Sequence, residues 1–232
     1  MSDQPSVKEL QARWDKIRVA NVYDTLDKMG YPNQCLDLKI KPLFPHRHLA
    51  GQAITLRGSA SPISYGEESA DWTGDYFSKL REILYPGCVA VIECGGEQHA
   101  GKFGEMTSWA LQQGGATGIV LDSYIRDWLG LEVIPNFTPC ALGTSPIESS
   151  SRWRMNGINI PIGMPGTVTA RVRVNPGDWI IGEADGVIVV PAAIAMEALE
   201  KAEKLEVEEQ GMRDDVAKGM SFDDAYKKWG RA

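Results

Sequence analysis

The chain of 232 residues carries a formal net charge of −7. This length suits one large domain with a sizeable core, and the acidic balance excludes a broad basic face that would bind nucleic acid or an acidic membrane regardless of sequence. No apolar run is long enough to cross a bilayer, and the first residues lack the charged and apolar regions of a signal peptide. We therefore expect a soluble, cytoplasmic protein with no nucleic-acid or membrane partner.

The first third of the chain predicts helices followed by a strand. Apolar residues recur at helical spacing over residues 6–29, which indicates one or two helices. Residues 51–58 alternate between apolar and polar, as a half-buried strand does. Residues 75–84 predict a further helix that ends before Pro86.

The middle of the chain predicts a strand, a helix and a strand. Residues 88–93 are apolar on both faces except at the end, which is typical of an interior strand. A loop over 94–101, a helix over 105–114 and a second interior strand over 118–122 follow. This order predicts a βαβ unit with parallel strands.

The remaining sequence predicts short strands and a final amphipathic helix. Strand-like runs occur at 133–135, 138–142, 167–174 and 179–190, and the helix covers 192–210. No repeat and no linker interrupts the chain, so we predict a single α/β domain over 1–232. Its core spans about 15–205, and a helical tail follows over about 206–232.

The segment from 104 to 127 combines groups that bind an anion and a metal ion. A helix that opens at Gly104 presents free backbone N–H groups to a carboxylate. Arg126, just after a buried strand, offers a planar fork for the same group. Asp127 is a hard oxygen ligand suited to Mg²⁺ or Mn²⁺. The same residues also occur in plain helix caps and solvated surface pairs, so the pattern alone leaves both interpretations open.

This segment resembles the RraA-like family, which includes class II 4-hydroxy-4-methyl-2-oxoglutarate/4-carboxy-4-hydroxy-2-oxoadipate aldolases. The family also contains the regulator of ribonuclease E activity A and proteins named as demethylmenaquinone methyltransferases. The resemblance rests on the Gly-Glu helix start, the twenty residues between Glu105 and Arg126, and the Arg-Asp pair. It extends over about residues 15–205 through further runs: Val22 to Asp27, Leu49 to Ala53, Val174 to Asp178 and Asp185 to Pro191.

The resemblance implies a fold, an assembly and a chemistry. The fold is a layered α/β/β/α arrangement around a β core, similar to phosphohistidine swivelling domains. The assembly is a homotrimer, or a hexamer of two trimers, with active sites between subunits. The chemistry is that of a metal-dependent lyase on a 2-oxo acid, which releases pyruvate by retro-aldol cleavage or decarboxylates oxaloacetate.

The resemblance also assigns roles to individual residues. The N–H groups of the helix start would hold the substrate carboxylate and carbonyl, Arg126 would neutralise the carboxylate, and Asp127 would hold the metal. Glu105 would support the metal or transfer a proton. The residues of the helix start are Gly104, Glu105, Met106 and Thr107.

Weaker candidates lie in the neighbouring loops, at Glu97, His99 and Asp122.

Breaking a carbon–carbon bond beside a 2-oxo group requires either a lysine Schiff base or a divalent metal as the electron sink. Lys102 lies just before Gly104, but no lysine stands beside the Arg-Asp pair, which favours the metal.

One departure from the aldolase pattern leaves alternatives open. In aldolases of the family the Arg-Asp pair is followed, after two residues, by another acid, and here Gly130 takes that place. Glu132, Glu97 or His99 could replace the missing acid. The alternatives are a non-catalytic regulator that binds a ribonuclease, or a different reaction on a sugar-acid derivative, for which His99 and Trp128 would be the distinguishing residues.

Overall fold

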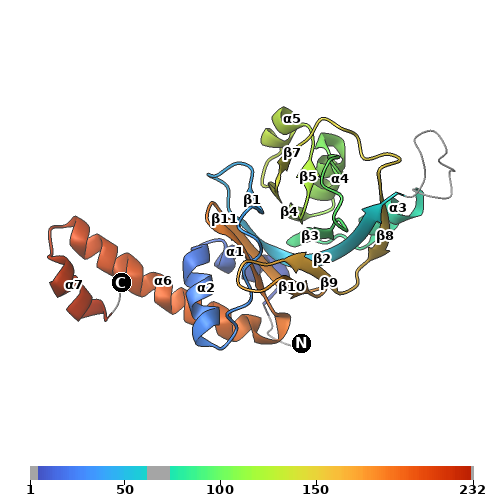
Figure 1. The fold of residues 1–232 in the computed structure, drawn as a ribbon. Helices are drawn as coiled ribbons and strands as arrows, with labels where there is room; N and C mark the ends of the chain where they lie inside the picture. The colour runs from blue at the N-terminus through green and yellow to red at the C-terminus, as the bar shows by residue number, and fades with distance from the viewer. Residues whose placement is uncertain (1–4, 62–73, 231–232) are drawn as a thin grey trace.

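The structure is a computed structural model that describes residues 5–61 and 74–230. Its centre is one mixed sheet with the strand order β1-β6-β4-β3-β2-β11-β12, and β8 pairs with β2 beyond the end of β11 (Figure 1). The strands are β1 (Lys41–Pro42), β2 (Leu49–Ala60), β3 (Cys88–Glu93), β4 (Ala116–Leu121), β6 (Thr138–Ala141), β8 (Trp153–Ile158), β11 (Trp179–Glu183) and β12 (Gly186–Val190).

Four neighbouring strands, β2, β3, β4 and β6, are parallel. The helix α4 (Glu105–Gln113) connects β3 to β4, so the predicted βαβ unit is confirmed. Because the carboxyl ends of parallel strands meet at one edge, the loops after β3 and β4 lie side by side there. Most of β2 is buried on both faces, rather than on one face as the alternation predicted, because it is central in the sheet.

The sheet curls until its two ends approach each other, since β1 contacts both β11 and β12. A hairpin of β9 (Ile162–Pro165) and β10 (Arg171–Val174) packs against the same interior. That interior is filled by small and branched side chains, among them Val89, Val120 and Val189. The result is a mixed α/β fold with a nearly closed, barrel-like β core, which confirms the predicted fold class.

Helices cover this core on two sides. α3 (Gly74–Glu82), α4 and α5 (Trp128–Glu132) lie on one side, and α1 (Val7–Trp14) and α2 (Val19–Lys28) lie on the other (Figure 1). Trp14 of α1 packs against Trp179 of β11, with ring centroids 6.2 Å apart. Each helix therefore buries its apolar face against the sheet, as in a layered domain.

The C-terminal helix is longer than its periodicity predicted. A 3-10 turn (Ala192–Ile194) leads into α6 (Ala195–Ala217), and a further helix, α7 (Phe222–Trp229), folds back on it. The first half of α6 packs on the core, whereas its second half and α7 project from the body (Figure 1). Gly211 permits this hairpin, because a Cβ there would overlap the Trp229 ring.

Two predicted strand segments differ from the structure, one wholly and one in part. Residues 133–135 follow α5 as a turn, with Val133 exposed and Asn136 in the left-handed region at φ 51°. The strand predicted over 167–174 begins only at Arg171. Among the described residues all four cysteines are free, and no helix there is long and apolar enough to span a membrane.

Candidate functional site

The two predicted halves of the site lie next to each other at the carboxyl edge of the sheet. After β4 the chain continues into β5 (Tyr124–Ile125), which pairs with β7 (Gly143–Thr144). The loop after β3 runs alongside it: Lys102 N–H donates to the Tyr124 carbonyl at 2.9 Å, and Arg126 N–H donates to the Phe103 carbonyl at 2.9 Å. The start of α4 and the Arg-Asp pair are therefore held in fixed register.

Asp127 joins these two segments through its carboxylate. Its Oδ2 accepts the Glu105 N–H at 3.1 Å, and its Oδ1 accepts Arg126 Nε at 3.2 Å. Asp127 also precedes α5 in the left-handed conformation, with φ 67° and ψ 50°, and makes no side-chain cap on that helix. Such a conformation costs a non-glycine residue roughly 1 kcal/mol or more, and residues of this kind cluster at functional sites.

Glycines allow the two segments to approach closely. A Cβ on Gly104 would overlap Asp127 Oδ2 and would lie 2.9 Å from Arg126 Cγ. A Cβ on Gly101 would lie 2.8 Å from Arg126 Cβ. Gly104 is therefore more than a helix cap, because any other residue there would displace the Arg-Asp pair.

The first turn of α4 retains part of its anion-binding capacity. The Gly104 N–H donates to Thr107 Oγ1 at 2.9 Å, and the Glu105 N–H is held by Asp127. Within the described part of the chain, the N–H groups of Met106 and Thr107 have no acceptor. Two of the four predicted donors are thus occupied by the protein itself, and two remain at the positive end of the helix dipole.

Arg126 has free hydrogen-bonding groups beside that turn. Its side chain is about one-third exposed, and only Nε is engaged, by Asp127. No described residue accepts a hydrogen bond from either Nη group. A guanidinium edge in this state can bind a carboxylate through two parallel bonds.

Gly130 and Glu105 occupy the same corner of the site. A Cβ on Gly130 would overlap the Glu105 carboxylate, so the Glu105 side chain fills the space that a side chain at position 130 would take. The Glu105 carboxylate therefore lies where a side chain at position 130 would begin, whereas Glu132 is exposed at the end of α5. A sequence comparison of single positions misses this proximity of Glu105 and Gly130.

The donor set at this corner suits a hard divalent cation. Mg²⁺ is commonly held by one or two carboxylates together with water and substrate oxygens. Asp127 and Glu105 provide such a pair, although no three His, Cys, Asp or Glu side chains converge within the described residues.

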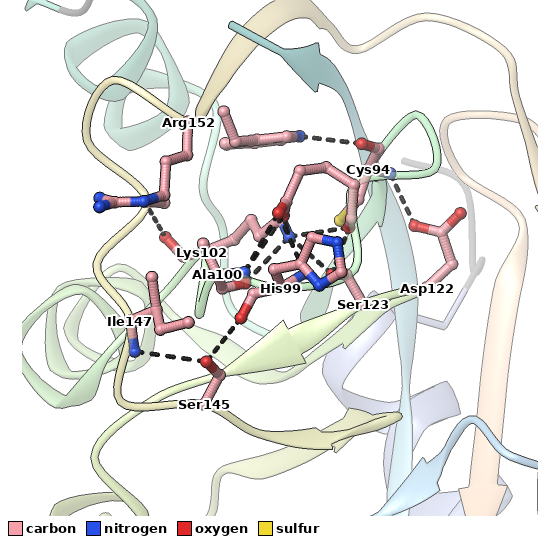
Figure 2. Close-up of polar contacts among 12 residues, drawn as sticks. Cys94, His99, Ala100, Lys102, Asp122, Ser123, Ser145, Ile147 and Arg152 are labelled. Atoms are coloured by element: carbon pink, nitrogen blue, oxygen red, sulfur yellow. Dashed lines mark hydrogen bonds and ion pairs between the residues drawn. The ribbon is translucent and has the colours of Figure 1, made fainter. Parts of the chain in front are cut away.

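Lys102 belongs to a buried cluster behind the site (Figure 2). Its ammonium, which has no exposed surface, donates to the Glu97 and Ala100 carbonyls at 2.8 and 2.9 Å and to Ser123 Oγ at 2.7 Å. It also pairs with the Glu97 carboxylate. Burial lowers the pKa of Lys102 to about 8. With its protons engaged, Lys102 is not free to form a Schiff base, which favours the metal as the electron sink.

The weaker candidates are not brought to the Arg-Asp pair. The Glu97 carboxylate forms an ion pair with Lys102. His99 is exposed in the loop, and its carbonyl accepts a hydrogen bond from Ser145 Oγ at 2.6 Å (Figure 2). Asp122 is buried and accepts the Cys94 N–H at 2.6 Å, and burial raises the pKa of its carboxyl. Trp128 packs edge-on against Phe44, with ring centroids 5.0 Å apart.

Ser123 was missed by sequence reasoning, because no local pattern marks a hydroxyl that binds a distant lysine.

The protein is an α/β protein with a mixed, nearly closed sheet. Its candidate ligand site lies at the carboxyl edge of the parallel strands, where the Arg-Asp pair stands beside a helix that begins at a glycine. The family description "RraA-like: Aldolase/RraA" matches residues 19–189. The chain belongs to the RraA-like family, as its motifs predicted.

Individual relatives agree with this assignment. A protein of Halalkalibacterium halodurans named "Putative 4-hydroxy-4-methyl-2-oxoglutarate aldolase" is 29% identical over 88% of this chain and 87% of its own length. An uncharacterized protein from Pseudomonas syringae pv. tomato has a similar fold, with a TM-score of 0.77 at 19% identity over 96% of this chain and 98% of its own. Streptomyces coelicolor RraAS2, described as an unusual member of the RNase ES inhibitor RraA family, superposes with a TM-score of 0.73 at 24% identity, covering 90% and 98% of the two chains.

Proposed function

We propose that the protein is a divalent-metal-dependent lyase that cleaves 4-hydroxy-4-methyl-2-oxoglutarate by a retro-aldol reaction and releases pyruvate. Oxaloacetate decarboxylation would be a second reaction of the same site, because both reactions pass through the enolate of pyruvate. The observation that carries the proposal is the meeting of Arg126, Asp127 and Glu105 at the start of α4, with Glu105 in the space left by Gly130.

Each group has a distinct task in this proposal. The free Nη groups of Arg126 bind the substrate carboxylate beside the 2-oxo group, and the N–H groups of Met106 and Thr107 orient it. Asp127, with Glu105 beside it, would hold Mg²⁺ or Mn²⁺. When bound, the cation supplies positive charge that stabilises the developing enolate.

Bond breaking requires the movement of one proton. The C3–C4 bond of the substrate breaks while the C4 hydroxyl loses its proton, and the electron pair passes into the enolate of pyruvate. We assign the Glu105 carboxylate as the proton acceptor, because it is the half-buried acid that reaches this corner. Return of the proton to C3 completes the reaction, so both fragments leave as pyruvate.

A further part of the proposal is that other copies of the chain complete the site in a homotrimer or a hexamer. Large apolar side chains on α4, on α5 and in the turn just after α5 are exposed beside the Arg-Asp pair: Met106, Trp128, Leu129 and Val133. Apolar groups gathered beside a polar site commonly mark a surface that a partner covers. Light scattering after size-exclusion chromatography measures the assembly, and a monomer at micromolar concentration would contradict this part.

The test is release of pyruvate, coupled to lactate dehydrogenase, from 4-hydroxy-4-methyl-2-oxoglutarate and from oxaloacetate. It is run with Mg²⁺ or Mn²⁺ and again with EDTA. We expect metal-dependent turnover, a loss in kcat/KM of roughly a hundredfold or more for Arg126→Ala, and no residual metal dependence for Asp127→Ala. Arg173→Ala, which changes an exposed arginine on β10, is the matched control and should leave turnover unchanged. Unchanged turnover in both site variants eliminates the proposed site.

The second candidate function is a non-catalytic protein that binds a ribonuclease. The observation that favours it is the incomplete ligand set, since no three metal-binding side chains converge within the described residues. A folded oligomer that neither binds Mn²⁺ nor turns over either substrate would decide for this candidate.

A further inference from the structure

A cavity opens at the carboxyl edge of the sheet, apart from the Arg-Asp pair. Its volume is about 240 Å³, and none of Glu105, Arg126 or Asp127 lines it. It lies between the ends of β4, β6 and β9 and the segment before β1. Its polar lining consists of Asp37, Lys39, Gln98, Asp122 and Tyr124, with apolar side chains between them.

Asp122 is the informative group in this lining. Its residue is only 8% exposed, and its Oδ1 accepts the Cys94 N–H at 2.6 Å. The donors that reach the carboxylate are the Cys94 groups and the N–H of Asp122 itself, and no other donor in the described chain does so. Figure 2 shows one oxygen turned to Cys94 and the other turned away from it. These donors are uncharged and need only an acceptor oxygen, which a neutral side chain could supply, so the fold does not require a charge here.

Asp178, a buried aspartate with only a structural role, provides a comparison for the hydrogen bonding of Asp122. Asp178 is 3% exposed, and its Oδ2 accepts Asn175 N–H and Nδ2 at 2.7 and 3.2 Å. Its Oδ1 accepts the Ala192 N–H at 2.9 Å. Both oxygens are thus used within the protein, whereas one oxygen of Asp122 is turned away from Cys94 and the residue lines a cavity. The contrast indicates that Asp122 keeps an acceptor for a ligand.

The lining also restricts the class of that ligand. Two carboxylates accept hydroxyl hydrogens, while the Lys39, Gln98 and Tyr124 side chains donate to oxygen. An anion would face both carboxylates, which disfavours it. At about 30 Å³ for each water molecule, the cavity holds roughly eight waters, the scale of a small sugar. We propose that this cavity binds a small neutral polyol, of roughly three to five carbons, through Asp122 and Gln98.

The test uses saturation-transfer NMR with glycerol, erythritol and D-ribose at tens of millimolar, together with the backbone amide resonance of Cys94. We expect saturation transfer to at least one polyol, and a shift of the Cys94 resonance, because that amide is bonded to Asp122. Asp122→Asn should weaken binding at least tenfold, because an amide nitrogen replaces the acceptor oxygen. Gln98→Ala, in an exposed loop, should also weaken binding and serves if the first variant does not fold.

Two controls separate this site from the proposed lyase site. Arg126→Ala should bind the polyol as the wild type does, because Arg126 does not line the cavity. Pyruvate should not displace the polyol. Absence of transfer from all three polyols, equal binding by Asp122→Asn and Gln98→Ala, or displacement by pyruvate would each overturn the proposal.

Discussion

Two polar clusters lie on the same pair of chain segments but differ in how their groups are satisfied. In the buried cluster, the Lys102 ammonium has acceptors on Glu97, Ala100 and Ser123 and no exposed surface. In the outer cluster, Arg126 and Asp127 are about one-third and two-fifths exposed, and the Nη groups of Arg126 are free. The buried cluster therefore fixes the two segments in place, whereas the outer cluster keeps hydrogen-bonding groups that a ligand can use.

The division follows from electrostatics in a low-dielectric interior. A buried charge is tolerated only when partners surround it, and removal of one partner leaves the other charge uncompensated. Lys102 and Gly104 are two residues apart, and Ser123 and Arg126 are three apart. The buried pairs therefore determine where the helix start and the arginine lie relative to each other.

The largest expected effect comes from Lys102→Met. It leaves the Glu97 carboxylate buried without its ammonium partner, so we expect a loss of roughly 3–5 kcal/mol in the free energy of unfolding. Urea denaturation measures it. Lys201→Met is the matched control, because Lys201 pairs with Glu197 on the exposed face of α6 and should cost about 0.5 kcal/mol or less. Similar losses in the two variants would show that the buried Lys102–Glu97 pair contributes no more to stability than an exposed ion pair.

The next effect concerns the outer cluster and rests on the proposed function. In Gly130→Ala the new Cβ would displace the Glu105 carboxylate, so we expect Mn²⁺ affinity to fall about tenfold, or about 1.4 kcal/mol. Stability should not fall, because alanine favours a helix over glycine by about 1 kcal/mol. Isothermal titration calorimetry measures the affinity.

A double-mutant cycle sharpens this result. In a Glu105→Gln background, Gly130→Ala should have almost no further effect on Mn²⁺ affinity, because both changes act on the same carboxylate. Arg173→Ala, which alters an exposed residue on β10, is again the control and should leave affinity unchanged. Additive losses in the cycle would show that the two positions act separately.

The part of the fold that could be predicted is the part that periodicity reports. Residues 88–93 and 118–121 are buried on nearly every position, so their apolar runs indicated interior strands correctly. From two parallel strands it follows that the loops after them are neighbours, and the structure places Gly104 beside Arg126 in these loops. Apolar spacing indicates which residues are buried against a core, whereas α7 packs on α6 and not on the core. The sequence therefore predicted a helical tail but not its projecting hairpin.

The contacts that complete the site could not be predicted in the same way. The proximity of Glu105 and Gly130 depends on the placement of α5, a helix of five residues that follows a left-handed aspartate. The burial of Lys102 depends on nearby carbonyls and on the Ser123 hydroxyl, which lies 21 residues further along the chain. Neither arrangement leaves a pattern in the sequence. Both depend on which residues are close in the folded structure, and the spacing of residues along the chain does not show this.

The smallest expected effect tests whether Asp122 reduces the stability of the fold. Burial raises the pKa of Asp122 in the folded protein, so the unfolded chain loses this proton at lower pH than the folded chain. The wild type therefore loses stability as pH rises from about 4 through the folded pKa. Relative to the wild type, Asp122→Asn should gain stability over that window and keep the gain at pH 7, because its amide oxygen still accepts the Cys94 N–H.

Asp178→Asn is the matched control for this last measurement, which follows urea denaturation from pH 4 to 7. An asparagine there exchanges one acceptor oxygen for a donor among three N–H groups, so the variant should lose stability at pH 7. A gain of stability in Asp122→Asn and a loss in Asp178→Asn would show that the Asp178 charge stabilises the protein, whereas the Asp122 charge is retained at a cost to stability. Loss of stability in both variants would show instead that the Asp122 charge contributes to the fold, and the argument for a ligand at that carboxylate would lose its basis.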